Sequence, residues 1–246
     1  MFGKLFKKKK LSEPVDLRGL KTDMHSHLVP GIDDGAPDME TAITLIKQFA
    51  ALGYKKLITT PHISSDIYKN NPQIIQEGLF DVRRTLEQEN INIKIEAAAE
   101  YLIDEGFAKL LEEGDLQTFG DKFILVELPY FNAPPNLFDM TFELQIKGYK
   151  IILAHPERYL YWYGELHRFQ ELKDRGIYFQ LNMLSLSGHY SGEVRKMAEK
   201  LIDSDMIDFL GSDMHNTYYM NLFIKTLREP YLKKIVDSGK LLNYQL

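Results

Sequence analysis

Hydrophobic positions along the chain follow two alternating periods. Short apolar runs such as YKKLITTPH at 54–62 and KFILVELP at 122–129 are typical of buried β-strands. Between such runs, stretches such as 38–52 place apolar residues every three or four positions, which indicates one buried helical face. The pattern therefore predicts strands that alternate with helices along the chain.

Seven strand–helix pairs follow from this alternation. The expected strands are residues 21–25, 54–62, 91–100, 122–129, 149–156, 176–182 and 206–213. The first four precede expected helices over 38–52, 73–89, 104–113 and 135–147, and further helical stretches follow the other three. Such alternation requires parallel pairing, and without a dinucleotide-binding fingerprint it favours a closed or nearly closed α/β barrel over an open sheet.

Composition agrees with one large domain. The chain has 246 residues, of which 44% are hydrophobic, and no linker or low-complexity segment interrupts the alternation. Gly53, Gly148 and Gly176 stand just before strands, where helix C-caps belong. We expect a single domain over 21–246, preceded by a flexible basic tail over 1–20.

Charge is uneven only at the N-terminus. Residues 1–10 hold five lysines and no acid, which leaves 25 basic and 35 acidic residues elsewhere, a net charge of −10. The acidic body argues against a nucleic-acid partner. Phe2, Leu5 and Phe6 among these lysines suit either weak contact with an anionic membrane or a solvated, frayed tail.

Targeting signals and cysteines are absent from the sequence. No apolar run approaches the ~18 residues that span a bilayer, and the N-terminus lacks the pattern of a secretory signal. The expected location is cytoplasmic, with the inner face of the membrane as an alternative through the lysine-rich tail. The lack of cysteine excludes disulfides, thiolate ligands and cysteine nucleophiles.

Side chains able to bind metal recur where the expected strands end. There are nine of them: His25, His27, Asp34, His62, Glu100, Glu127, His155, Asp213 and His215. A parallel barrel brings the C-terminal ends of its strands to one face. His27 follows His25 by two residues, so both side chains lie on one side of an extended segment and can share an ion; Asp213 and His215 repeat this spacing.

The acids among these nine residues strengthen the prediction of a metal centre. Burying Glu100, Glu127 and Asp213 would be costly without cations, and no lysine or arginine lies within those strand ends. Five histidines and four carboxylates suffice for about three ligands on each of three divalent ions. Manganese is the expected ion, with iron, zinc and cobalt as alternatives for ligands that include no sulfur.

These residues lie in motifs that together resemble a known superfamily. The motifs are HSH (25–27), DDG (33–35), TPH (60–62), AAE (98–100), VELP (126–129), AHPER (154–158) and GSDMH (211–215). The set resembles the PHP (polymerase and histidinol phosphatase) superfamily, and within it the capsule-type bacterial protein-tyrosine phosphatases. The resemblance spans about residues 21–216 and implies a distorted TIM-like (β/α)7 barrel, the PHP fold, with a three-metal site.

The resemblance also implies how the ions are shared. One ion is held by His25, His27, Glu100 and Asp213, a second by Glu100, Glu127 and His155, and a third by Asp34, His62 and His215. In the DDG loop Asp34 is the expected ligand and Asp33 the alternative.

Arg158 follows the ligand His155 by three residues and is the expected phosphate clamp, because a guanidinium can bind two phosphate oxygens at once. The alternative is a surface salt bridge. A second arginine is expected from the resemblance soon after GSDMH, but residues 216–221 read NTYYMN, with no basic residue until Lys225. We expect Arg158, Asp213 and His215 to be the catalytic residues.

The expected reaction is hydrolysis of a phosphomonoester by a metal-bound hydroxide, without a phosphoenzyme. A phenolate with a pKa of ~10 leaves more readily than an alkoxide, which favours aryl phosphates. The resemblance implies a phosphotyrosine protein as partner, the tyrosine-rich tail of a bacterial tyrosine kinase that controls capsule or exopolysaccharide assembly. The alternatives are a small metabolite such as histidinol phosphate, a nucleic-acid end, or a non-catalytic metal-binding kinase partner.

Other residues have less specific roles. The aromatic run Tyr159, Tyr161, Trp162 and Tyr163 suits either a groove for a phosphotyrosine peptide or packing onto the barrel. Asn182 is a candidate hydrogen-bond partner of a ligand. His167 and His189 are expected at the surface.

Overall fold

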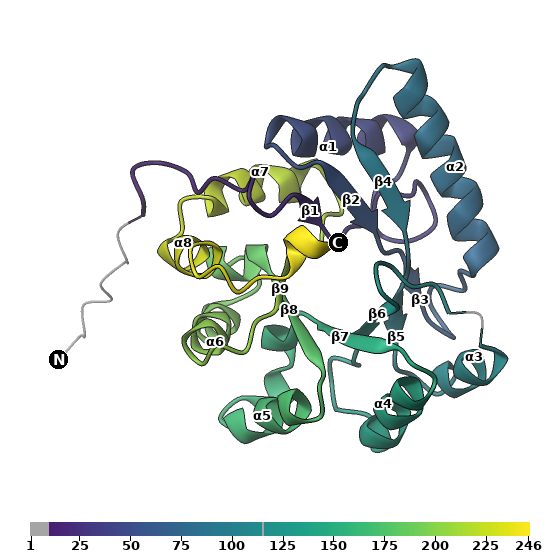
Figure 1. Ribbon diagram of the computed structural model, residues 1–246, viewed down its shortest axis with the longest axis vertical. Helices are drawn as coiled ribbons and strands as arrows, with labels where there is room; N and C mark the ends of the chain where they lie inside the picture. The colour runs from purple at the N-terminus through teal and green to yellow at the C-terminus, as the bar shows by residue number, and fades with distance from the viewer. Residues whose placement is uncertain (1–9, 115) are drawn as a thin grey trace.

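A ring of short parallel strands lies at the centre of the molecule, and helices surround it (Figure 1). The computed structural model describes residues 10–114 and 116–246. The strands in these residues are β1 (Thr22–Asp23), β2 (Lys56–Thr59), β3 (His62–Ile63), β4 (Lys94–Ala97), β5 (Glu100–Leu102), β6 (Phe123–Glu127), β7 (Lys150–Ala154), β8 (Tyr178–Asn182) and β9 (Phe209–Gly211). The α-helices are α1 (Met39–Ala51), α2 (Pro72–Gln88), α3 (Phe107–Glu113), α4 (Leu137–Ile146), α5 (Leu166–Asp174), α6 (Gly192–Asp203), α7 (Thr217–Thr226) and α8 (Pro230–Val236).

The strands form two parallel sheets that meet to make the ring. Their orders are β1-β2-β4 and β3-β5-β6-β7-β8-β9. Beyond the ends of β1 and β9, Ser26 forms a parallel bridge with Met214. At the other junction, the amide of Glu100 donates to the carbonyl of Pro61. The prediction of a distorted α/β barrel is confirmed.

Two of the expected strands are each broken into a pair. Residues 54–62 contain β2 and the start of β3, and residues 91–100 contain β4 and the start of β5. Pro61 lies at the first break, where its missing amide hydrogen interrupts the ladder. As a result, His62 and Glu100 begin short strands rather than ending long ones, and they pair with each other in register.

The first two helices lie within one residue of their predicted bounds, whereas α3 begins three residues and α4 two residues later than predicted. Asp38 and Asn71 cap α1 and α2 by accepting from backbone amides within the first turn. Gly53, Gly148 and Gly176 precede strands with φ of 95°, 84° and 78°, a left-handed conformation that favours glycine. Buried apolar faces of the helices cover the outside of the ring, and each such side chain contributes roughly 1.5–3 kcal/mol.

The segment before β1 differs from the flexible tail expected over 1–20. Val15, Leu17 and Leu20 are buried, and the amide of Val15 donates to the carbonyl of Leu227. Lys10 pairs with Glu229 at 3.2 Å. The described part of this segment therefore packs against the barrel, because its apolar residues reach the core. The proposed membrane contact of residues 1–9 lies outside the described residues.

A short C-terminal segment closes the ring at the end where the strands begin. Asn243 is buried, donates to the carbonyls of Thr22 and Leu210 and accepts from the amide of Leu210. Figure 1 shows the C-terminus near the middle of the ring, beside β1. None of the helices in the described part of the chain is long and apolar enough to cross a bilayer.

Candidate metal centre

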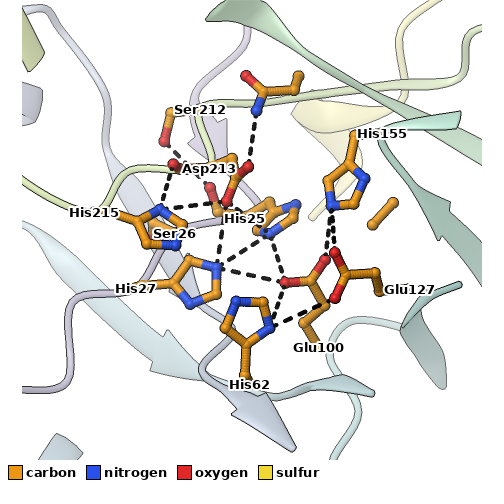
Figure 2. A network of polar contacts seen from close by, with 12 residues as sticks. His25, Ser26, His27, His62, Glu100, Glu127, His155, Ser212, Asp213 and His215 are labelled. Atoms are coloured by element: carbon orange, nitrogen blue, oxygen red, sulfur yellow. Dashed lines mark hydrogen bonds and ion pairs between the residues drawn. The ribbon is translucent and has the colours of Figure 1, made fainter. Parts of the chain in front are cut away.

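All nine predicted ligands lie together at the C-terminal face of the ring, and Figure 2 shows most of them pointing toward one another. We call them the nine-residue cluster. Their possible ligand atoms fall within 4.8 Å of one another in four overlapping groups: His27, Asp34, His62 and His215; His25, Glu100 and His155; His25, His27 and Asp213; and His62, Glu100 and Glu127.

Contacts across these groups bring together the residues that the resemblance assigns to each ion. His155 places Nε2 3.0 Å from Oε1 of Glu100 and 3.5 Å from Oε1 of Glu127. His25 and His27 do share a group, and their Nε2 atoms are 3.3 Å apart. The carboxylate of Glu100 belongs to two of the four groups, and its two oxygens face different histidines: Oε1 is 3.0 Å from Nε2 of His155, and Oε2 is 3.2 Å from Nε2 of His25.

Partners behind the histidines fix how their rings face the cluster. His25 places Nδ1 2.9 Å from Oε1 of Gln180, and His27 places Nδ1 2.8 Å from Oδ2 of Asp33. His215 donates from Nδ1 to the carbonyl of Asp213 at 2.8 Å. Such contacts select the tautomer in which Nε2 carries the free lone pair, which is the state that binds metal.

The DDG loop separates the roles of its two acids. Asp33 accepts from the amides of Gly35 and His62 in addition to its contact with His27. Asp34 instead places Oδ1 3.5 Å from Nε2 of both His62 and His215. The geometry therefore favours Asp34 as a ligand and makes Asp33 the residue that orients His27.

Charge in the cluster is unbalanced toward negative. Glu100, Glu127 and Asp213 are at most 6% exposed. Burial raises the pKa of Glu127, and repulsion from Glu100 raises it further, to about 8. Burial lowers the pKa of His25, but the negative charges of Glu100 and Asp213 outweigh the effect of burial and raise the pKa of His25 to about 9. Without another cation, the cluster therefore binds protons at neutral pH.

Two members of the cluster have left-handed backbone conformations. His155 has a φ of 33° directly after β7, and Asp213 has a φ of 49° two residues after β9. Such conformations are costly for residues other than glycine and concentrate at functional sites. Both turn the chain sharply at the top of a strand, where their side chains reach the cluster.

Arg158 lies beside the cluster and is held from three sides. Its Nη1 donates to Oδ2 of Asp213 at 3.1 Å. Its guanidinium carbon lies 4.9 Å from the ring centre of Tyr130 and 4.4 Å from that of Tyr190. Burial lowers the pKa of Arg158, but the surrounding phenols and carboxylates raise this pKa by more than burial lowers it. The guanidinium therefore stays charged. Arg158 does form a salt bridge, but its partner Asp213 is buried, and Arg158 lines a cavity rather than the outer surface.

The cavity above the cluster has a volume of about 370 Å³. Its base includes buried ligands such as His155 and Asp213, and its walls include the rings of Tyr68, Tyr130 and Tyr190. Among the described residues that line it, Arg158 is the only lysine or arginine. The space is within the range of small-molecule sites, and its walls suit an aromatic ring.

The aromatic run after Arg158 does not line this cavity. Tyr159 is fully buried, and its hydroxyl donates to the carbonyl of Ala154 and accepts from the amide of Leu128. Trp162 is also buried and packs edge-on against Phe169. The packing alternative is therefore correct for these two residues.

Several residues of the site were missed from the sequence. Tyr130 donates to Oε1 of Glu127 at 2.5 Å, and Gln180 contacts His25. Asn182, the candidate partner, donates to Oδ2 of Asp213 at 2.8 Å and to the hydroxyl of Tyr190. The available signal for Gln180 was a polar residue inside the apolar strand GIYFQLN; Tyr130 carried none.

These observations define a class of protein. The nine-residue cluster offers imidazole and carboxylate donors with no sulfur, and Arg158 is the one lysine or arginine among the described residues that line the cavity above it. Its excess negative charge and its converging donors fit divalent metal ions. The molecule is a parallel α/β barrel with a metal-binding centre at the C-terminal face, where barrel enzymes place their chemistry.

Comparisons with known proteins agree with this class. Residues 21–238 match the family model for capsular polysaccharide synthesis, CpsB/CapC. The tyrosine-protein phosphatase YwqE of Bacillus subtilis is 29% identical over 81% of this chain and 79% of its own. The tyrosine-protein phosphatase CpsB of Streptococcus pneumoniae is 25% identical over 87% of this chain and 88% of its own.

A solved structure is also similar to this chain. It comes from crystal structures of YwqE from Bacillus subtilis and CpsB from Streptococcus pneumoniae, which are described as unique metal-dependent tyrosine phosphatases. Its fold matches the fold of this chain with a TM-score of 0.79. The two chains are 26% identical, and the match covers 91% of this chain and 89% of the other. The protein belongs to the CpsB/CapC family.

Proposed function

We propose that the protein is a metal-dependent phosphatase that removes phosphate from tyrosine residues of a protein. The observation that carries the proposal is the cavity itself, because its lining combines five residues of the nine-residue cluster with Arg158 and four tyrosines. The similar proteins named tyrosine-protein phosphatases support the same reaction.

The nine-residue cluster would hold the divalent ions, and we propose three ions with manganese as the first candidate. When bound, such ions lower the pKa of water and withdraw negative charge from a phosphoryl group. Imidazole and carboxylate ligands are consistent with manganese, iron, zinc or cobalt, so metal analysis of the purified protein tests both identity and number.

Arg158, Asp213 and His215 form the proposed catalytic group. Arg158 donates one hydrogen bond from Nη1 to Oδ2 of Asp213, which leaves most of its five N–H donors available for phosphate oxygens. Asp213 connects this clamp to the ligands, since its other oxygen lies 3.4 Å from Nε2 of both His25 and His27. His215 lines the cavity beside them.

The proposed substrate class follows from the leaving group and the walls. A phenolate departs with far less protonation than a serine alkoxide would, which favours an aryl phosphate as substrate. We propose a bacterial tyrosine kinase with a tyrosine-rich tail as the partner, in capsule or exopolysaccharide assembly, in keeping with the family. We also propose that the protein acts in the cytoplasm, with the inner face of the membrane as the finer location.

A substrate panel tests the proposal. The purified protein is assayed with Mn²⁺, and again after chelation, on a phosphotyrosine peptide, a phosphoserine peptide, histidinol phosphate and a nuclease substrate. We expect metal-dependent turnover of the phosphotyrosine peptide above all others. Equal turnover of the phosphoserine peptide or preference for histidinol phosphate would contradict it, and no turnover with any metal would favour a non-catalytic role.

A further inference from the structure

Two large apolar side chains stand at the mouth of the cavity and face solvent. Ile67 is 72% exposed and Phe131 is 94% exposed, and both line the cavity that leads down to the nine-residue cluster. Isolated exposed apolar residues are common on proteins. These two differ from Phe80 and Phe142, which lie on the outer faces of α2 and α4 and do not line the cavity.

The two residues belong to loops on opposite sides of one strand. Ile67 lies in the loop after β3, and Phe131 lies in the loop after β6. In the sheet, β5 lies between β3 and β6. Neighbouring strands are about 4.8 Å apart, so the two loops leave the sheet about 10 Å apart, which an extended peptide covers in about three residues.

The cavity is graded from polar to apolar between its base and its mouth. Glu127, His155 and Asp213 at the base are buried, and Tyr68 and Tyr190 in the walls are partly buried. Exposure then rises from 42% at Tyr130 to 72% at Ile67 and 94% at Phe131. A phosphate bound at the base would place an attached aromatic ring along the walls. The residues next to a phosphotyrosine would then lie at the level of Ile67 and Phe131.

We propose that Ile67 and Phe131 form an apolar rim that binds apolar side chains located within about three residues of the phosphotyrosine in a protein substrate. The inference rests on the proposed phosphatase function and adds a preference for sequence around the phosphotyrosine. The proposed occupant is a polypeptide. The rim is continuous with the cavity that holds the proposed phosphate site, and this cavity is too small to hold the residues that flank a phosphotyrosine as well.

The test compares two phosphotyrosine peptides of equal length and charge, one with leucine and one with serine at the positions two residues before and after the phosphotyrosine. A small aryl phosphate, para-nitrophenyl phosphate, reports the chemistry alone. The variants are Ile67→Ser and Phe131→Ser, with Phe142→Ser as the matched control on the outer face of α4.

We expect the unmodified protein to prefer the leucine peptide by about tenfold in kcat/KM, as partial burial of apolar side chains predicts. Each rim variant should reduce this preference below about threefold and leave turnover of para-nitrophenyl phosphate within about twofold of the unmodified protein. Phe142→Ser should keep the full preference.

Three results would overturn the inference. The first is that the unmodified protein shows no preference between the two peptides. The second is that the rim variants lose para-nitrophenyl phosphate turnover as strongly as peptide turnover. The third is that the rim variants change the sedimenting mass, which would make the rim a contact between copies of this chain. If no substrate is hydrolysed, the proposed function fails, but the apolar rim can still be tested by binding. Fluorescence anisotropy then measures the affinity of the protein for the same two peptides after labelling, and equal affinity for both rejects the proposed rim.

Discussion

Arg158 shows how single residues determine the chemistry of the cavity. Its guanidinium lies between the rings of Tyr130 and Tyr190 and donates to Asp213. Stacking between two rings holds a planar group in one orientation, which a lysine ammonium cannot reproduce. Since residues 216–221 supply no basic side chain, we propose that Arg158 alone makes the phosphate contact that a second arginine was expected to share.

Arg158→Lys should therefore impair substrate binding strongly. We expect kcat/KM for a phosphotyrosine peptide to fall on the order of 10- to 100-fold, because the forked contact with phosphate is lost. The inhibition constant of inorganic phosphate should rise in parallel. Arg175→Lys is the matched control, since Arg175 lies 4.1 Å over the ring of Phe138 on the outside of the barrel. Unchanged phosphate inhibition in Arg158→Lys would reject the clamp.

The DDG loop is the element that shows most clearly how backbone shape places ligands. A Cβ atom on Gly35 would collide with the carbonyl and the Cβ of His27. The loop must approach this close for Asp33 to reach both Nδ1 of His27 and the amide of His62. Glycine is required here by space, not by conformation.

Gly35→Ala should weaken metal binding without unfolding the barrel. Displacing Asp33 and His27 removes both a ligand and the group that orients it, and losses of about 10- to 100-fold in affinity are typical of such changes. Titration of Mn²⁺ into metal-free protein measures the effect. Gly19→Ala serves as the control because its added Cβ would meet nothing within 4 Å. Equal affinity in both variants would contradict this role of the loop.

Sequence patterns predicted the order of elements well and their interruptions poorly. Strand β6 (Phe123–Glu127) lies inside the expected 122–129, because a continuous apolar run buried on both faces is a strong signal. The break between β2 and β3 depends on which strands pair across the ring, although Pro61 marked it. Ligands were found by their recurrence at strand ends, whereas Tyr130 and Tyr190 reach Arg158 from distant loops that no local pattern connects.

At the scale of the whole molecule, metal binding and folding are linked through protons. In metal-free protein the pKa of His25 is raised to about 9 and that of Glu127 to about 8. Between about pH 7 and pH 9 the folded state therefore binds more protons than the unfolded state. As a result, the free energy of unfolding falls as pH rises toward 9. Bound ions replace these protons and remove the dependence.

The unfolding temperature of chelator-treated protein should accordingly fall by about 5 °C or more between pH 7 and pH 9. Protein saturated with Mn²⁺ should unfold at higher temperature and change much less over the same range. Calorimetry or circular dichroism at several pH values checks this. An increase in stability of the metal-free protein with pH would show that these protons are not bound as the geometry indicates.

Closure of the ring at the opposite end depends on Asn243. Its side chain makes three hydrogen bonds to β1 and β9, so Asn243→Ala leaves buried backbone groups of Thr22 and Leu210 without partners. We expect a loss of about 2–4 kcal/mol in the free energy of unfolding, measured by urea denaturation, with metal affinity unchanged. Gln245→Ala, a neighbouring exposed position, should have little effect.

The two sheets of the ring meet at two junctions, and the nine-residue cluster draws side chains from both sheets. His25 and His27 follow β1, whereas Glu100, Glu127 and His155 belong to the six-stranded sheet or follow its strands. Ions bound there would link the two sheets of the barrel through their shared ligands. Removing them should quicken amide hydrogen exchange first at the bridge between Ser26 and Met214, well before the central strands lose protection.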